Sequence, residues 1–194
     1  HPLQMLPTKG HIRKQNQQTF MTYLFENEID LFPTSMPEIH QRVRQIDPVK
    51  YAKTRNFVNG SVTRLSPYIS RGVVSTKGLL RYVLDLGYAP KKIEKFIQEL
   101  AWRDYWQQIW ITRQDEINSD LKHAQAPVAN YGMPKALLAA KTGIEALDKA
   151  LEEFYDTGYV HNHMRMYLAS VACNIGQSHW KVPAQWMYYH LFDA

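Results

Sequence analysis

The chain has 194 residues, 45% of them hydrophobic and 21% charged, which excludes a disordered polypeptide and suits one domain with at most a small appendage. Its net charge of +5 is compatible with an anionic partner such as nucleic acid. The single cysteine, Cys173, allows no internal disulfide bond and predicts a reducing compartment, the cytoplasm. No apolar run approaches the roughly 18 residues that cross a bilayer, so we expect no membrane partner.

The first part of the chain is predicted to form a helical arm over residues 1–46. Residues 1–10 contain two prolines and a glycine and should be irregular. Residues 11–28 end in a group of apolar side chains and should form a helix that packs through that end. A short helix over residues 37–45 should follow, with Ser35 as its cap.

Residues 47–194 are predicted to form a second, all-α domain, because strand-like alternation of apolar and polar residues is nowhere sustained. Turn signals at Pro48 and Asn59-Gly60 indicate an irregular stretch over residues 47–64. Beyond it, helices are expected over residues 66–72 and 76–86, from Pro90 through residue 110, between Gly143 and Gly158, and over residues 163–174 and 183–191.

The segment 96–110, F-I-Q-E-L-A-W-R-D-Y-W-Q-Q-I-W, contains three of the five tryptophans. At helical spacing, one face carries Glu99, Trp102, Arg103 and Trp106. A carboxylate, a guanidinium and two indoles are costly both to bury and to expose, so they suit a pocket wall that stacks on a flat ligand. Phe96, Ile97, Leu100 and Ala101 lie on another side of the helix and should face a core. The alternative is a Glu–Arg pair on a solvated helix, beside aromatic side chains in an ordinary core.

Two further stretches could carry chemistry. In residues 157–166, Asn162 offers an amide and Arg165 a fixed charge on one helical face. Alternatively, Asn162 caps the helix and Arg165 forms a surface ion pair. In residues 62–72, hydroxyls and arginines lead into a helix start that can hold a phosphate, and ordinary capping is the alternative.

No metal site is predicted. His161 and His163 would diverge by about 200° on a helix, and neither an H-E-x-x-H motif nor a cysteine pair is present. A hydrolytic triad is likewise unsupported, because no G-x-S-x-G motif occurs.

Together and in this order, these stretches resemble the FAD-binding helical domain of the DNA photolyase and cryptochrome family. The resemblance runs from about residue 50 to the last residue. Five motifs carry it: Y-A-K-T-R-N-F (51–57), T-R-L-S-P-Y (63–68), E-L-A-W-R-D-Y (99–105), Thr142-Gly143 with Asp148 and Ala150, and T-G-Y-V-H-N-H-M-R-M (157–166).

The resemblance implies FAD as the cofactor, bound within an all-α domain. By position, Arg165 and Asp193 would form an ion pair beside the isoalloxazine ring. The diphosphate and ribitol would be held by Tyr51 and by the loop residues Val62, Thr63, Arg64, Leu65 and Ser66.

The implied activity is light-driven DNA repair, in which excited reduced flavin lends an electron that splits a cyclobutane pyrimidine dimer. Damaged DNA would be the partner, and Arg55, Arg103 and His163 would contact it. His163 stands where the family has an arginine. The flipped dimer would enter a cavity lined by Glu99, Trp102, Asn162 and Met166. Trp180 matches the middle tryptophan of the family's electron-transfer chain.

The chain departs from the family pattern at both ends. We expect no α/β antenna domain in this sequence, so a light-harvesting chromophore would need a separate antenna-domain protein. The family continues after Asp193 with D-x-A-x-N-x-x-x-W-Q-W, which predicts a domain incomplete at its C-terminus. Two alternatives therefore stay open: a cryptochrome-like flavin photoreceptor or signalling module, and a non-catalytic DNA-binding remnant.

Overall fold

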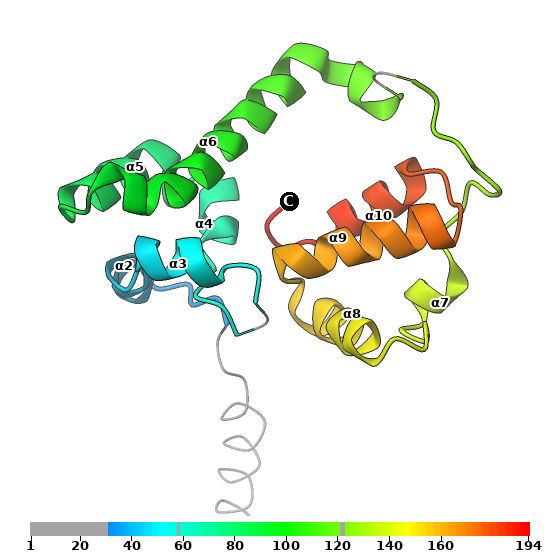
Figure 1. Ribbon diagram of the computed structural model, residues 1–194, viewed down its shortest axis with the longest axis horizontal. Helices are drawn as coiled ribbons and strands as arrows, with labels where there is room; N and C mark the ends of the chain where they lie inside the picture. The colour runs from blue at the N-terminus through cyan, green and yellow to red at the C-terminus, as the bar shows by residue number, and fades with distance from the viewer. Residues whose placement is uncertain (1–30, 58, 121–122) are drawn as a thin grey trace, which may run out of the picture. The chain divides into compact units, whose positions relative to one another are not determined.

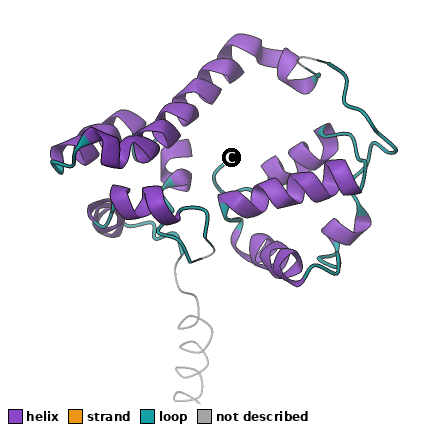
Figure 2. Ribbon diagram, viewed as in Figure 1, coloured by secondary structure: helices purple, strands orange, loops and turns teal. Residues whose placement is uncertain are grey.

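The computed structural model describes residues 31–57, 59–120 and 123–194, and within these ranges the chain is helical without a strand. The all-α prediction is therefore confirmed (Figure 2). A single bridge joins Asn130 to Ser178. The predicted loose arm and the helix over residues 11–28 lie outside the described residues. Ser35–Ala194 forms one compact unit, which begins twelve residues before the predicted domain start at residue 47.

In the described part of the chain, five helices precede the long connection over residues 114–134 (Figure 1). Their bounds are α2 Met36–Arg44, α3 Pro48–Thr54, α4 Ser66–Ser70, α5 Thr76–Asp85 and α6 Pro90–Arg113. As predicted, Ser75 caps α5 by accepting a hydrogen bond from the N–H of Gly78 at 3.0 Å. Pro90 begins α6, the 24-residue helix that contains the aromatic segment.

The prediction of an irregular stretch over residues 47–64 was wrong for its first part, where α3 forms. The Asp47 carboxylate accepts hydrogen bonds from the N–H groups of Val49 and Lys50 at 3.1 and 2.8 Å. Pro48 takes the first helical position, where its missing N–H costs nothing. Asp-Pro is therefore a helix start here rather than a turn.

The second half of the chain contains the helices on either side of the motif T-G-Y-V-H-N-H-M-R-M (157–166). Gly158, with φ of 66°, ends α8 in the left-handed conformation, as its position predicted. The predicted helix over residues 163–174 is split into α9 and a π-helical turn. The bounds are a 3₁₀ turn at Gln114–Asn118, α7 Lys135–Leu138, α8 Glu145–Thr157, α9 Asn162–Ser170, the π turn Val171–Ile175 and α10 Lys181–His190.

Two sets of buried apolar side chains hold these helices in place. In α6, Ile93 and Phe96 are buried, but Ala101, which we expected to face a core, is exposed. A second core fixes α8 against α9 and comprises Leu137, Leu147, Leu151, Phe154, Val160, Leu168 and Ala172. Because burial of these faces fixes the rotation of α6 and α9, it also fixes the direction of their polar side chains. None of the described helices is long and apolar enough to cross a membrane.

Candidate functional site

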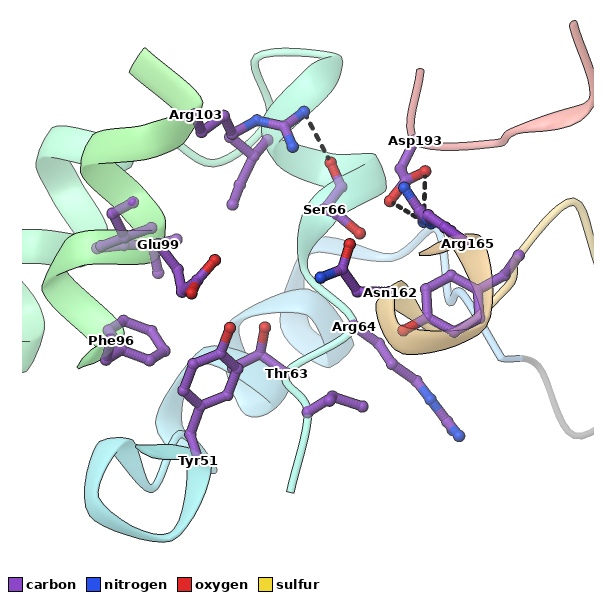
Figure 3. A pocket seen from close by; sticks show the side chains of 15 residues that line it. Tyr51, Thr63, Arg64, Ser66, Phe96, Glu99, Arg103, Asn162, Arg165 and Asp193 are labelled. Atoms are coloured by element: carbon purple, nitrogen blue, oxygen red, sulfur yellow. Dashed lines mark hydrogen bonds and ion pairs between the residues drawn. The ribbon is translucent and has the colours of Figure 1, made fainter. Parts of the chain in front are cut away.

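Segments far apart in the chain converge on one cavity of about 240 Å³ (Figure 3). Its walls come from α3, the loop before α4, α4 itself, α5, α6, the turn before α9, α9 and the C-terminal segment. The lining residues are Tyr51, Val62, Thr63, Arg64, Ser66, Ile69, Leu79, Phe96, Glu99, Leu100, Arg103, Tyr159, Asn162, Arg165 and Asp193. The cavity thus joins residues from all three stretches that the sequence singled out.

A buried ion pair forms one wall. Arg165 Nη2 donates to both carboxylate oxygens of Asp193, at 2.9 and 2.8 Å, and the Asp193 side chain is only 4% exposed. The Arg165 guanidinium also donates from Nε to the Val160 carbonyl at 3.0 Å and lies 6.0 Å from the centroid of the Tyr159 ring. The alternative of a surface ion pair for Arg165 is therefore wrong.

Asn162 is not the helix cap that the alternative interpretation required. The N-cap of α9 is His161, whose Nδ1 accepts a hydrogen bond from the N–H of His163 at 3.2 Å. Because His161 caps the helix, the Asn162 side chain is not needed there, and its amide extends toward the side of the cavity where Glu99 lies (Figure 3). An amide in this position can donate to and accept from a ligand.

Glu99 is paired with Arg55, the residue that follows α3, instead of the neighbouring Arg103 on α6. Arg55 donates from Nε to Glu99 Oε1 at 3.3 Å, and the two side chains are 23% and 35% exposed. Tyr51 packs edge-on against Phe96, with ring centroids 5.1 Å apart. Burial, reinforced by the Glu99 carboxylate and opposed by Arg55, raises the pKa of Tyr51 to about 12, so its phenol stays a hydrogen-bond donor at neutral pH.

The loop before α4 and the first residue of α4 each bring a hydroxyl to the cavity wall. Arg64 adopts a φ of 52°, the left-handed region that non-glycine residues rarely occupy. Its side chain points away from the other labelled residues (Figure 3). Thr63 and Ser66 line the cavity, whereas the Leu65 side chain is 1% exposed and does not. A second, polar cavity of about 400 Å³ shares Val62, Thr63 and Arg64 with the first.

Arg103 reaches the cavity with an unused donor. Its Nη2 lies 3.5 Å from the Ser66 carbonyl oxygen, and its buried Nε has no hydrogen-bond partner among the described residues. Burial lowers the pKa of Arg103, an effect that nearby Asp193 opposes. A buried donor without a partner is uncommon and marks a place where an acceptor group can bind.

Six predicted site residues do not line this cavity: Arg55, whose pairing with Glu99 is described above, and Leu65, Trp102, Met166, Trp180 and His163. Trp102 and Met166 are 53% and 56% exposed, so they are available at the surface without lining the cavity. Trp180 donates through its indole N–H to Asp120 and borders two other cavities. His163 packs edge-on against Tyr167, 5.2 Å between ring centroids. Their predicted roles stay predictions.

The sequence did not assign five of the lining residues to the site: Ile69, Leu79, Phe96, Leu100 and Tyr159. Tyr159 lies inside the 157–166 motif, so its place in that motif was a signal that could have found it. The other four are apolar residues at ordinary helical spacing, and nothing in the pattern separates a cavity wall from a core.

His161 should make stability pH-dependent. Burial, with smaller effects from the charges of His163, Arg165 and Arg64, lowers the pKa of His161 from 6.5. The imidazole of His161 therefore binds a proton more readily in the unfolded chain than in the folded one. Its contribution to the free energy of unfolding is fully present above pH 6.5 and is lost as pH falls through the folded-state pKa. Urea unfolding should give a smaller free energy at pH 5.5 than at pH 7.5.

The exchange His161→Asn keeps a good capping side chain and should flatten this dependence. His40→Asn, on the exposed side of α2, should leave it in place. If the free energy of unfolding changed with pH equally in the unmodified chain and in the His161→Asn variant, His161 would not be the cause of the pH dependence.

Comparison with known proteins places this site in a family. The model of the FAD-binding domain of DNA photolyase matches residues 96–194. A deoxyribodipyrimidine photo-lyase of Alkalihalophilus pseudofirmus is 28% identical over 62% of this chain and 26% of its own length. Cryptochrome-1 of Sinapis alba is 25% identical over 75% of this chain and 32% of its own length.

A solved structure shares the fold. The crystal structure of a bacterial class III photolyase from Agrobacterium tumefaciens superposes with a TM-score of 0.67 at 20% identity, covering 82% of this chain and 34% of that one. The chain therefore spans about a quarter to a third of the length of the relatives it matches.

Proposed function

The chain belongs to the family of the FAD-binding domain of DNA photolyase, and from this premise we propose that it binds FAD and acts in light-driven splitting of cyclobutane pyrimidine dimers in DNA. The observation that carries the proposal is the convergence of Glu99, Asn162 and the Arg165–Asp193 pair on one cavity. These groups present a carboxylate, an amide and a shielded charge pair to the same space. Such a set can bind the polar edges of flat heterocycles.

The residues present fit part of FAD. The hydroxyls of Thr63 and Ser66 and the unpartnered Arg103 Nε can donate to phosphate or carbonyl oxygens. The cavity volume of about 240 Å³ lies below the roughly 300–1,000 Å³ of whole-ligand pockets, so a dinucleotide would extend beyond it. When bound, FAD supplies the light-driven electron transfer.

The chain's own residues would bind and orient the damaged base. The Glu99 carboxylate, held by Arg55, accepts hydrogen bonds, and the Asn162 amide both donates and accepts. Trp102, exposed on α6, offers a stacking surface where an extruded base would arrive. Arg55 can exchange part of its contact with Glu99 for a DNA phosphate.

The test begins with FAD content and then measures repair. The purified chain is titrated with FAD and its flavin absorption recorded after gel filtration. The reduced complex is then illuminated with an oligonucleotide containing one thymine dimer, and recovered thymine is measured against a dark control. Recovery only in the light supports the proposal. A chain that retains no FAD would support the alternative of a non-catalytic DNA-binding remnant. A chain that retains FAD but yields no recovered thymine would support the alternative of a photoreceptor.

Glu99→Gln separates a role in substrate binding from one in structure. Because it removes a charge-assisted hydrogen bond to the substrate, we expect repair to fall about 10- to 150-fold with FAD content unchanged. Glu152→Gln, on the exposed side of α8, is the matched control and should leave repair unchanged. Parallel loss of FAD and repair would make Glu99 structural instead.

The similarity to Cryptochrome-1 of Sinapis alba favours one second candidate, a flavin photoreceptor. A photoreceptor would retain FAD through the same loop and ion pair but would not depend on Glu99 and Asn162 for its output.

A further inference from the structure

The C-terminal segment of the chain is bonded to two sets of helices, α2–α6 and α7–α10 (Figure 1). The N–H of Phe192 donates to the Gly158 carbonyl at 2.7 Å, which holds the segment to the end of α8. From the other set, Arg71 donates from Nη1 to the Phe192 carbonyl oxygen, and the guanidinium carbon of Arg71 lies 4.3 Å from the centroid of the Phe192 ring. The two backbone polar groups of Phe192 are therefore bonded one to each set of helices.

Arg71 extends from a short helix that is anchored in the protein interior. It directly follows α4, in which Pro67 and Tyr68 are buried. The N–H of Val73 donates to the Tyr68 carbonyl at 2.8 Å, so the turn that carries Arg71 is bonded back to the helix. The same helix begins at Ser66, which lines the cavity. One anchored element therefore carries a cavity hydroxyl at one end and the Arg71 guanidinium at the other.

The residue held by Arg71 directly precedes the buried acid of the cavity wall. Asp193 follows Phe192 and is bonded to Arg165 of α9, so this ion pair ties the wall only to its own set of helices. Helices pack mainly within each set, α3 and α5 on α6 and α8 on α9. The stack of Trp110 on Tyr188 also joins the two sets, but neither ring lines the cavity. The contact through Arg71 is therefore placed to hold the cavity wall against α4.

We propose that Arg71 is a positioning residue, which holds the Arg165–Asp193 wall against α4 and so couples ligand binding in the cavity to the placement of the C-terminal segment. We call the contact between Arg71 and Phe192 the clasp. Its hydrogen bond and its cation–π contact both use the flat guanidinium group. A ligand bonded to Ser66 and to the wall would bridge the same two elements, so ligand and clasp should stabilise each other. The coupling rests on the proposed function only in taking FAD as the ligand.

Amide hydrogen exchange tests the clasp without a ligand. The Phe192 N–H exchanges when the segment detaches from Gly158, and NMR of the isotope-labelled chain follows this single amide. Arg71→Gln removes the clasp and should speed the exchange about 5- to 30-fold, as for the loss of a charged hydrogen bond and an exposed cation–π contact. Arg81→Gln, on the exposed side of α5, should leave the exchange unchanged. The amide of Leu168, inside α9, should be unaffected in both variants.

Two further exchanges separate the clasp from a simple effect of charge. Arg71→Lys keeps the positive charge but lacks the planar group, so it should restore little of the protection of the Phe192 amide. Phe192→Leu removes the ring but keeps the carbonyl, and it should speed the exchange less than Arg71→Gln does. Full protection in Arg71→Lys would mean that charge alone is sufficient, and the clasp would then be wrong.

Titration with FAD tests the coupling between the clasp and the cavity. Added FAD should slow the exchange of the Phe192 amide in the unmodified chain. By reciprocity, Arg71→Gln should bind FAD about 5- to 30-fold more weakly, and Arg81→Gln should bind it as tightly as the unmodified chain. Because the exchange measurement needs no flavin, a chain that binds no FAD would contradict the proposed function, and Arg71→Gln would still decide whether the clasp exists.

Two results would overturn the proposal. Unchanged exchange of the Phe192 amide in Arg71→Gln would mean that Gly158 alone holds the segment. Faster exchange with unchanged FAD affinity would mean that the clasp holds the segment but does not position the cavity wall. Because Arg71 is exposed, the variant should fold, and equal exchange of the Leu168 amide in the variant and the unmodified chain confirms that it does.

Discussion

Arg165→Met is expected to lower the free energy of unfolding by about 3–5 kcal/mol, because it leaves the Asp193 carboxylate buried without its partner. The Asp193 side chain is only 4% exposed, and both its oxygens accept from Arg165 at 2.8–2.9 Å. Little water can reach the carboxylate to compensate. Urea unfolding at neutral pH measures the loss.

Two variants establish the cause of that loss. Adding Asp193→Leu to Arg165→Met should recover most of the stability, since an apolar pair often replaces a buried ion pair at little cost. Arg113→Met breaks an exposed ion pair with Glu116, whose side chains are 54% and 62% exposed, and should cost no more than about 1 kcal/mol. Similar losses for Arg113→Met and Arg165→Met would mean that water screens the Asp193 pair.

Local signals were sufficient to predict most helix boundaries. Ser75, Pro90 and Gly158 act through capping or fixed backbone angles, which depend on a residue and its near neighbours. The failure at α3 has the same origin: Asp47 and Pro48 form an equally local helix start, but we read the proline as a turn. The local sequence at residues 47–48 therefore contained the signal for a helix start, and the error was to choose the turn instead.

Contacts between distant elements could not be predicted from spacing. Helical periodicity places Glu99 beside Arg103, yet Glu99 pairs with Arg55, 44 residues away, because α3 packs across α6. The approach of Asp193 to Arg165 was expected only from the family resemblance. Helical periodicity also predicted that Trp102 lies on the same face as Glu99. A helix face 100° wide can border both a cavity and the solvent, however, and Trp102 lies on the solvent side.

Gly158 combines a left-handed backbone with close contacts to the C-terminal segment, so we expect it to be sensitive to substitution. A Cβ at this position would lie 3.1 Å from Phe192 Cβ and 3.2 Å from the His190 carbonyl oxygen, and φ is 66°. The N–H of Phe192 also donates to the Gly158 carbonyl at 2.7 Å. The end of α8 therefore holds the segment that carries Asp193 to Arg165.

Gly158→Ala should cost about 2–4 kcal/mol, of which about 1–2 comes from the left-handed backbone and the rest from the displaced segment. Gly143→Ala is the matched control, because Gly143 has a φ of 81° but nothing within 4 Å of an added Cβ. It should show the backbone cost alone. Urea unfolding of both variants gives the difference, and equal losses would mean that residues 190–192 move aside freely.

A double variant tests whether this displacement reaches the ion pair. If Gly158→Ala moves Asp193 away from Arg165, the pair is already weakened, so adding Arg165→Met should cost less than it does alone. We expect the two losses to fall short of additivity by more than about 0.5 kcal/mol, as for residues that share a backbone shift. Strict additivity would confine the effect of Gly158 to the end of α8 and leave the cavity wall independent of it.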